Sequence, residues 1–209
     1  KMTISSKEEM EKIEKDLKGA AYQVTDVKKG ERVKKAPLPF TTSTLQQEAS
    51  KVLNFSTQKT MRIAQQLYEG VEIKGSGTVG LITYLRTDST RVSEEAEAMS
   101  HKFITENYGG EYAADVHTKE KEGKKIQDAH EAIRPTDIER VPSEIKDSLS
   151  REQFRLYQLI WKRFTASRMA SAVYETTSVK IDANGYRFTV AASKVKFDGF
   201  MSVYTQEED

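Results

Sequence analysis

The segment GLITYLRTDSTRVS, residues 80–93, places a tyrosine and an arginine two positions apart after a short apolar run. With the two-residue period of an extended strand, Tyr84, Arg86 and Asp88 share one side of this segment. Tyrosine can form covalent enzyme intermediates, but an ordinary phenol has a pKa of about 10 and is a poor nucleophile at neutral pH without help. A guanidinium stays protonated and matches phosphate oxygens with two parallel hydrogen bonds. Two interpretations are therefore open: a half-buried surface strand, or a tyrosine nucleophile that attacks a phosphodiester beside Arg86.

The three histidines lie in different settings. His101 falls on a predicted helix surface and His117 in a charged segment, and neither has neighbours at the spacing of metal ligands. His130 stands in DAHEAIRPTD, where two further acids and an arginine follow it closely. This cluster is either a loop cap or a polar site. Because the chain has no cysteine and no H-E-x-x-H motif, a zinc site is not predicted.

A literal G-x-G-x-x-G occurs at Gly75, Gly77 and Gly80. A helical pattern precedes it and an extended segment follows, which is the reverse of the dinucleotide-binding arrangement. The kinase motifs V-A-I-K, H-R-D and D-F-G do not occur, nor does G-x-x-x-x-G-K-[ST]. We therefore predict a flexible turn here and no site for nucleotide hydrolysis in this chain.

Composition sets broad limits on function. The 33 basic and 32 acidic residues nearly cancel, so any binding to nucleic acid or membranes has to use a local patch. The hydrophobic fraction of 37% is ordinary for a globular protein, and no run of apolar residues is long enough to suggest a membrane span. The absence of cysteine excludes disulfides and fits a reducing cytoplasm.

Helical periodicity and capping residues predict the elements that position these side chains. Helices are expected to begin at caps formed by Ser6 with Glu9, Ser43 with Gln46, Ser56, Ser93, and Ser150 with Gln153. A brief helix is expected to start at Pro142. The last helix is the main core candidate, through Phe154, Leu156, Tyr157, Ile160, Trp161 and Phe164. Residues 20–35 are expected to be a strand that runs into a basic, turn-prone connection, and further strands are expected at 81–88, 173–181, 186–192 and 194–204.

This order of elements predicts an α+β fold. A mainly helical region, residues 44–170, is flanked by strand-bearing ends, residues 1–43 and 171–209. Pro37 and Pro39 disfavour helix and mark the first boundary. We expect the two ends to form one domain and the helical region to be inserted in it.

Four segments together resemble the type IA DNA topoisomerases of bacteria. They are PFTTSTLQQEASKVLNFSTQKTMRIAQQLYEG, GLITYLRTDSTRVS, DAHEAIRPTDI and LYQLIWKRFTASRMA, and they keep the order and spacing of that family within residues 38–209. One departure is Leu85, where the family more often has methionine, and this exchange conserves volume.

The resemblance implies roles for individual residues. Tyr84 would attack a DNA phosphodiester, become joined to the 5′ phosphate and leave a 3′ hydroxyl, so that another strand passes before religation without ATP. Arg86 would contact the scissile phosphate and His130 would position it. Gln65, in the preceding helix, is a further candidate for contact with DNA.

The family fold is a torus, in which residues 44–170 would be the movable domain with the tyrosine and the flanking segments part of a strand-rich arch. The family's Mg²⁺ site is an acidic cluster with an Asp-x-Asp pair in a preceding domain, and no Asp-x-Asp occurs here. We therefore expect a central piece of the enzyme that binds no Mg²⁺ itself and does not relax DNA alone. Its expected partners are single-stranded DNA and the metal-binding and gate domains of the same polypeptide, in the bacterial cytoplasm with the chromosome and without a membrane.

A second class of function starts from the two helices in residues 44–69, which resemble a helix-turn-helix. With the basic segment Lys28 to Lys35, they could form a non-catalytic DNA-binding module. Tyr84 distinguishes the two hypotheses, because a simple binding module does not need one particular phenol.

Overall fold

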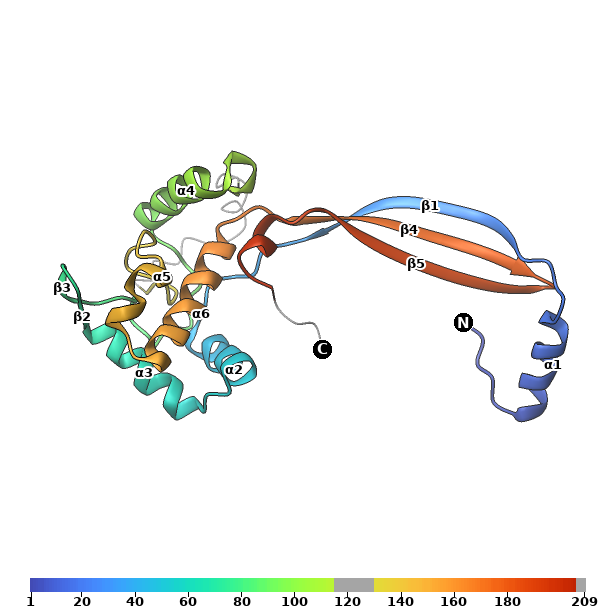
Figure 1. Ribbon diagram of the computed structural model, residues 1–209, viewed down its shortest axis with the longest axis horizontal. Helices are drawn as coiled ribbons and strands as arrows, with labels where there is room; N and C mark the ends of the chain where they lie inside the picture. Colours follow the sequence, from blue (N-terminus) through green and yellow to red (C-terminus); the bar gives the residue numbers. More distant parts are fainter. Residues whose placement is uncertain (115–129, 206–209) are drawn as a thin grey trace. The chain divides into compact units, whose positions relative to one another are not determined.

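The computed structural model describes residues 1–114 and 130–205, which group into two compact units. The strand unit consists of Lys1–Lys34 and Val173–Phe197, and the helical unit of Lys35–Ala172 with the residues from Asp198 onward. Helices and antiparallel strands both occur, which confirms the predicted α+β class (Figure 1). The assignment of these units to domains of a larger enzyme stays a prediction.

The strand unit contains a three-stranded sheet and one helix. The helix is α1 (Lys7–Leu17), and the sheet has the order β1 (Gln23–Lys34), β4 (Ala172–Ala183) and β5 (Tyr186–Phe197). β4 and β5 form an antiparallel hairpin in which Ala183 pairs with Tyr186. The two loop residues, Asn184 and Gly185, have φ angles of 43° and 79°. Asn-Gly is suited to this tight turn, since both positions need the left-handed region.

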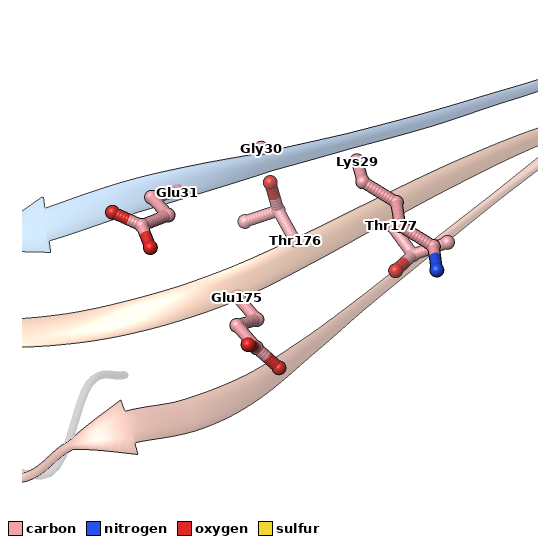
Figure 2. A pocket seen from close by; sticks show the side chains of 6 residues that line it. All are labelled: Lys29, Gly30, Glu31, Glu175, Thr176 and Thr177. Carbon is pink, nitrogen blue, oxygen red and sulfur yellow. The ribbon is translucent and has the colours of Figure 1, made fainter.

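β1 runs through the basic segment for which the sequence predicted a turn-prone connection. Pairing with β4 explains the difference, because charged side chains on the sheet find partners on the other strands. Lys196 forms an ion pair with Glu31, and the Arg32 guanidinium lies 4.5 Å from the centre of the Tyr174 ring. Gly30 has no side chain, and a Cβ there would lie 3.3 Å from Thr176 Oγ1. Gly30 and Thr176 are among the residues that line a hollow of about 380 Å³ on this sheet (Figure 2).

The helical unit is built around one long helix. Its elements are α2 (Thr42–Leu53), α3 (Thr57–Glu69), β2 (Val71–Ile73), β3 (Gly77–Val79), α4 (Glu94–Tyr108), α5 (Pro142–Ile145), α6 (Arg151–Ser167) and the 3₁₀ turns η1 (Gly110–Tyr112), η3 (Lys146–Ser148) and η4 (Gly199–Ser202). Figure 1 shows α6 in the middle of this unit, where it packs against α2, α3 and α5. Five of its predicted core side chains are buried: Leu156, Tyr157, Ile160, Trp161 and Phe164. The indole nitrogen of Trp161 donates to Ile138 O over 2.8 Å, so this buried polar atom is satisfied.

Four predicted helix caps are confirmed, at Ser6, Ser56, Ser93 and Ser150. The predicted start of α2 is wrong, because the cap is Thr41 with Thr44. The Thr44 amide donates to Thr41 Oγ1 over 3.3 Å, and the Thr41 amide donates to Thr44 Oγ1 over 2.9 Å. This reciprocal pair satisfies two amides that the first turn of a helix leaves unpaired.

The predicted strand at residues 194–204 is correct only as far as Phe197, where β5 ends. Gly199 has φ +51°, and a Cβ there would lie 2.5 Å from Ala170 O. Only glycine fits this close approach, which turns the chain into η4 and buries Phe200 in the helical unit. None of the helices in the described parts of the chain has the length and apolar character needed to cross a membrane.

Candidate active site

The segment with Tyr84 is not part of a sheet and bends at Thr83 and Leu85, so the predicted strand at residues 81–88 is wrong. Its only ladder-type pairing among the described residues is an isolated bridge between Ile82 and Pro135. The predicted alternation nevertheless holds beyond Ile82: Leu85 is fully buried, whereas Tyr84 and Arg86 are exposed. Tyr84 and Arg86 therefore both project from the core toward solvent.

The first half of this segment is held by residues 132–136. The amide of Thr83 donates to Arg134 O over 2.9 Å, and the Thr83 hydroxyl donates to Ala132 O over 2.7 Å. The amide of Thr136 donates to Leu81 O over 3.0 Å. These bonds fix the backbone immediately before Tyr84.

The second half is held by the first residue of α2. The Thr42 hydroxyl donates to Leu85 O over 2.7 Å and accepts from the Thr87 amide over 2.9 Å. The Thr42 amide also donates to Thr87 O over 2.9 Å. Because one threonine replaces a neighbouring strand here, the segment is ordered without forming a ladder.

The end of α3 approaches the same segment closely. The Leu81 amide donates to Leu67 O over 2.8 Å, and a Cβ at Gly80 would lie 2.9 Å from Tyr68 O. The ring of Tyr68 lies edge-on to that of Tyr84, with centroids 5.3 Å apart and planes at 62°. Tyr68 is exposed, and the sequence analysis did not single it out. Its helical spacing gave no signal that it lies beside Tyr84.

Two adjoining surface hollows contain three of the predicted site residues. The tyrosine hollow, of about 280 Å³, is lined by Tyr68, Thr83, Tyr84, Thr87, His130 and Glu131. The arginine hollow, of about 500 Å³, is lined by Thr41, Thr42, Ser43, Gln46, Arg86, Thr87, Asp88 and His130. His130 and Thr87 line both, so the two hollows adjoin at these residues. Gln65 lines neither, and its amide nitrogen donates to Glu69 on α3 over 2.7 Å.

Glu131, which lines the tyrosine hollow, forms an ion pair with Arg134. Burial alone would raise the pKa of the Glu131 carboxyl, but the Arg134 guanidinium and hydrogen bonds from Ser93 outweigh burial and hold this pKa below its ordinary value. Glu131 is therefore an anion at neutral pH, and its charge is neutralised by Arg134 at 2.7 Å.

The described residues do not fit a magnesium site. Within residues 1–114 and 130–205, no three His, Asp or Glu side chains are grouped so that they could hold a metal ion. Asp88 is the one acid that lines the arginine hollow. The chemistry derived below therefore uses no metal ion bound to this chain.

The paired helices α2 and α3 were the basis of the alternative, non-catalytic hypothesis. Two cations of α3, Lys59 and Arg62, lie close to Glu152 of α6, Arg62 at 3.8 Å. The basic segment 28–35 is almost entirely in β1 of the other unit. These positions give the helix-turn-helix hypothesis no specific support.

Comparison with known proteins agrees with this fold. A family model described as DNA topoisomerase matches residues 1–209, the whole chain. The chain therefore belongs to the type IA DNA topoisomerase family, as the four sequence segments predicted. Its structure is similar to that of full-length topoisomerase I from Thermotoga maritima, with a TM-score of 0.84 and 40% sequence identity. The match covers 100% of this chain and 33% of that protein, so the chain spans about a third of its length.

Proposed function

We propose that this chain supplies the nucleophile with which a type IA topoisomerase transiently cleaves one DNA strand. The observation that carries the proposal is the position of His130, which lines both the hollow of Tyr84 and the hollow of Arg86. A phosphodiester seated where the hollows meet can contact the phenol, the guanidinium and the imidazole together. Tyr84 is 45% exposed, so its hydroxyl is accessible to a DNA strand.

The proposed reaction exchanges one phosphoester bond for another. The phenol oxygen of Tyr84 bonds to phosphorus, and the bond from phosphorus to the 3′ oxygen breaks. The phenol proton is transferred to the leaving 3′ oxygen, which becomes a hydroxyl. Arg86 stabilises the charge that develops on the phosphate oxygens, while His130 positions the phosphate. The tyrosine ester retains the energy of the phosphodiester, so religation needs no ATP.

Relaxation of negatively supercoiled DNA also requires passage of a second strand through the gap. We assign this step to the whole polypeptide, in which a gate domain opens and an acidic domain outside this chain holds Mg²⁺. Gln65, on α3, is proposed to contact DNA beyond the reacting phosphate. The proposed setting is the bacterial cytoplasm, where the partner is a single-stranded region of the chromosome.

The test compares the two phenols that share the tyrosine hollow. Tyr84→Phe and Tyr68→Phe are made in the full-length enzyme, and each variant is incubated with an end-labelled single-stranded oligonucleotide and Mg²⁺. We expect Tyr84→Phe to give no covalent adduct on a denaturing gel while it binds the oligonucleotide normally, because only the nucleophilic oxygen is removed. Tyr68→Phe should still form the adduct. An adduct from Tyr84→Phe, or its loss only in Tyr68→Phe, would refute the assignment.

A further inference from the structure

The short segment 130–134, which contains His130, is fastened to three different parts of the helical unit. The amide of Ala132 donates to Arg91 O over 2.8 Å, and the amide of Ile133 donates to Phe40 O over 2.9 Å. The amide of Arg134 donates to Thr83 Oγ1 over 3.0 Å. Thr83 and Arg134 thus bond in both directions, immediately before the proposed nucleophile.

Two charged side chains of this segment add bonds that the backbone does not provide. One carboxylate oxygen of Glu131 accepts from the Ser93 amide over 2.5 Å, at the N-cap of α4, and the other accepts from Arg134 Nη2 over 2.7 Å. Arg134 Nη1 donates to Pro135 O over 3.0 Å. The two side chains are only 19% and 12% exposed, respectively.

The arrangement is not optimised for stability alone. Arg134 Nε is buried with no hydrogen-bond partner among the described residues, and a buried donor without an acceptor costs free energy. Replacement of buried ion pairs by apolar groups is often neutral or stabilising, so such a pair is weak evidence for a purely stabilising role. Both residues also adjoin a proposed reacting residue: Glu131 follows His130, and the backbone of Arg134 exchanges hydrogen bonds with Thr83.

We propose that Glu131 and Arg134 are positioning residues for DNA cleavage, whose ion pair holds His130 and Tyr84 at the spacing that one phosphate requires. The inference rests on the proposed function. The carboxylate of Glu131, the residue after His130, bonds both the N-cap of α4 and the Arg134 guanidinium. The backbone of Arg134 in turn bonds Thr83, the residue before Tyr84. A displacement of about 1 Å at a reacting group can reduce a rate by about 10²-fold, so loosening of this link should lower cleavage without any loss of a DNA contact.

The molecule contains a matched control for this proposal. Glu97 of α4 forms an ion pair with Arg168, at the end of α6, and their side chains are 21% and 13% exposed. This pair resembles Glu131–Arg134 in chemistry and burial, but neither partner lines the tyrosine or arginine hollow. Replacement of either glutamate leaves one buried arginine without its anion.

The experiment compares Glu131→Gln with Glu97→Gln in the full-length enzyme. For each variant we measure the thermal midpoint, the Kd for a single-stranded oligonucleotide, and the single-turnover rate of adduct formation at saturating oligonucleotide, well below the midpoint. We expect both variants to lose thermal stability and to keep their Kd within about three-fold. The cleavage rate should fall by about ten-fold or more in Glu131→Gln, and by less than about two-fold in Glu97→Gln.

Two further variants make the outcome decisive. Arg134→Lys keeps the charge and loses the planar fork, so its cleavage rate should lie between those of the wild type and Glu131→Gln. If Glu131→Gln fails to fold, Glu131→Asp replaces it in the comparison with Glu97→Gln. Equal cleavage rates for the variants of the two ion pairs would overturn the positioning role. Tyr84→Phe is measured in parallel, because a covalent adduct from that variant would refute the proposed function itself. If Tyr84→Phe gives no adduct and Glu131→Gln cleaves at the normal rate, only the positioning role is refuted.

Discussion

Leu85 separates the two residues that we assign to the chemistry, and its burial determines how they are presented. Leu85 is fully buried, whereas its neighbours Tyr84 and Arg86 are exposed, so the core holds the segment between the two functional groups. The spacing of Tyr84 and Arg86 is therefore maintained by the hydrophobic residue between them.

At this scale the first prediction concerns Arg86→Lys in the full-length enzyme. Lysine keeps the positive charge but loses the planar fork that pairs with two phosphate oxygens. We expect the single-turnover cleavage rate to fall by about 10²- to 10³-fold, the usual loss when one transition-state donor is removed. The control is Arg62→Lys on α3, whose side chain is 64% exposed and lines neither hollow, and whose rate should not change. A wild-type rate for Arg86→Lys would mean that Arg86 is only a surface residue.

The elements of the helical unit differ in how far they could be predicted from the sequence. Caps such as Ser56, Ser93 and Ser150 were predictable because their bonds reach only three residues along the chain. The order of residues 80–93 was not, because its partners are Thr42 and residues 132–136, about 40 to 50 positions away. Tyr84, Arg86 and His130 were proposed as site residues from their residue types and family motifs, and their roles stay predictions. The position of Tyr68 beside Tyr84 and the positioning role inferred for Glu131 depend on contacts between distant segments and needed the structure.

At the scale of elements, the prediction concerns the link between α2 and the segment of Tyr84. Thr42→Val keeps the shape of the side chain and removes the hydroxyl that bonds Leu85 O and the Thr87 amide. We expect a loss of about 1 to 3 kcal/mol in the free energy of unfolding of the helical unit, because these two groups lose a partner. Urea unfolding of the 209-residue chain, followed by the fluorescence of its single tryptophan, Trp161 in α6, measures this loss.

The control for this link is Ser43→Ala, one residue further along α2. The Ser43 hydroxyl is exposed and accepts from the exposed Gln47 side chain over 3.0 Å. Its removal should change the free energy of unfolding by less than about 0.5 kcal/mol, as is usual for surface substitutions. Equal losses in the two variants would show that Thr42 does not hold the segment.

At the scale of the whole molecule, the chain combines a strand unit and a helical unit within about a third of the length of the Thermotoga maritima relative. The proposed nucleophile and both of its proposed partners, Arg86 and His130, belong to the helical unit. Within the described residues no acidic cluster accompanies them. We therefore propose that this chain supplies the groups that attack a phosphate, whereas strand passage and the alignment of the 3′ hydroxyl are assigned to the rest of the polypeptide.

The last prediction concerns residues 1–209 without the rest of the polypeptide. Residues 1–209 alone, incubated with negatively supercoiled plasmid and Mg²⁺, should leave the ladder of topoisomers unchanged. Relaxation requires cleavage, strand passage and religation, and the charge around a transferring phosphoryl group is usually neutralised by metal ions that a dedicated acidic site holds. The full-length enzyme at the same concentration is the positive control, and its Tyr84→Phe variant is the negative control. Addition of the separately expressed acidic domain should restore cleavage if the two pieces associate. Efficient relaxation by residues 1–209 alone would contradict this account, because these residues would then contain a metal site and a strand gate of their own.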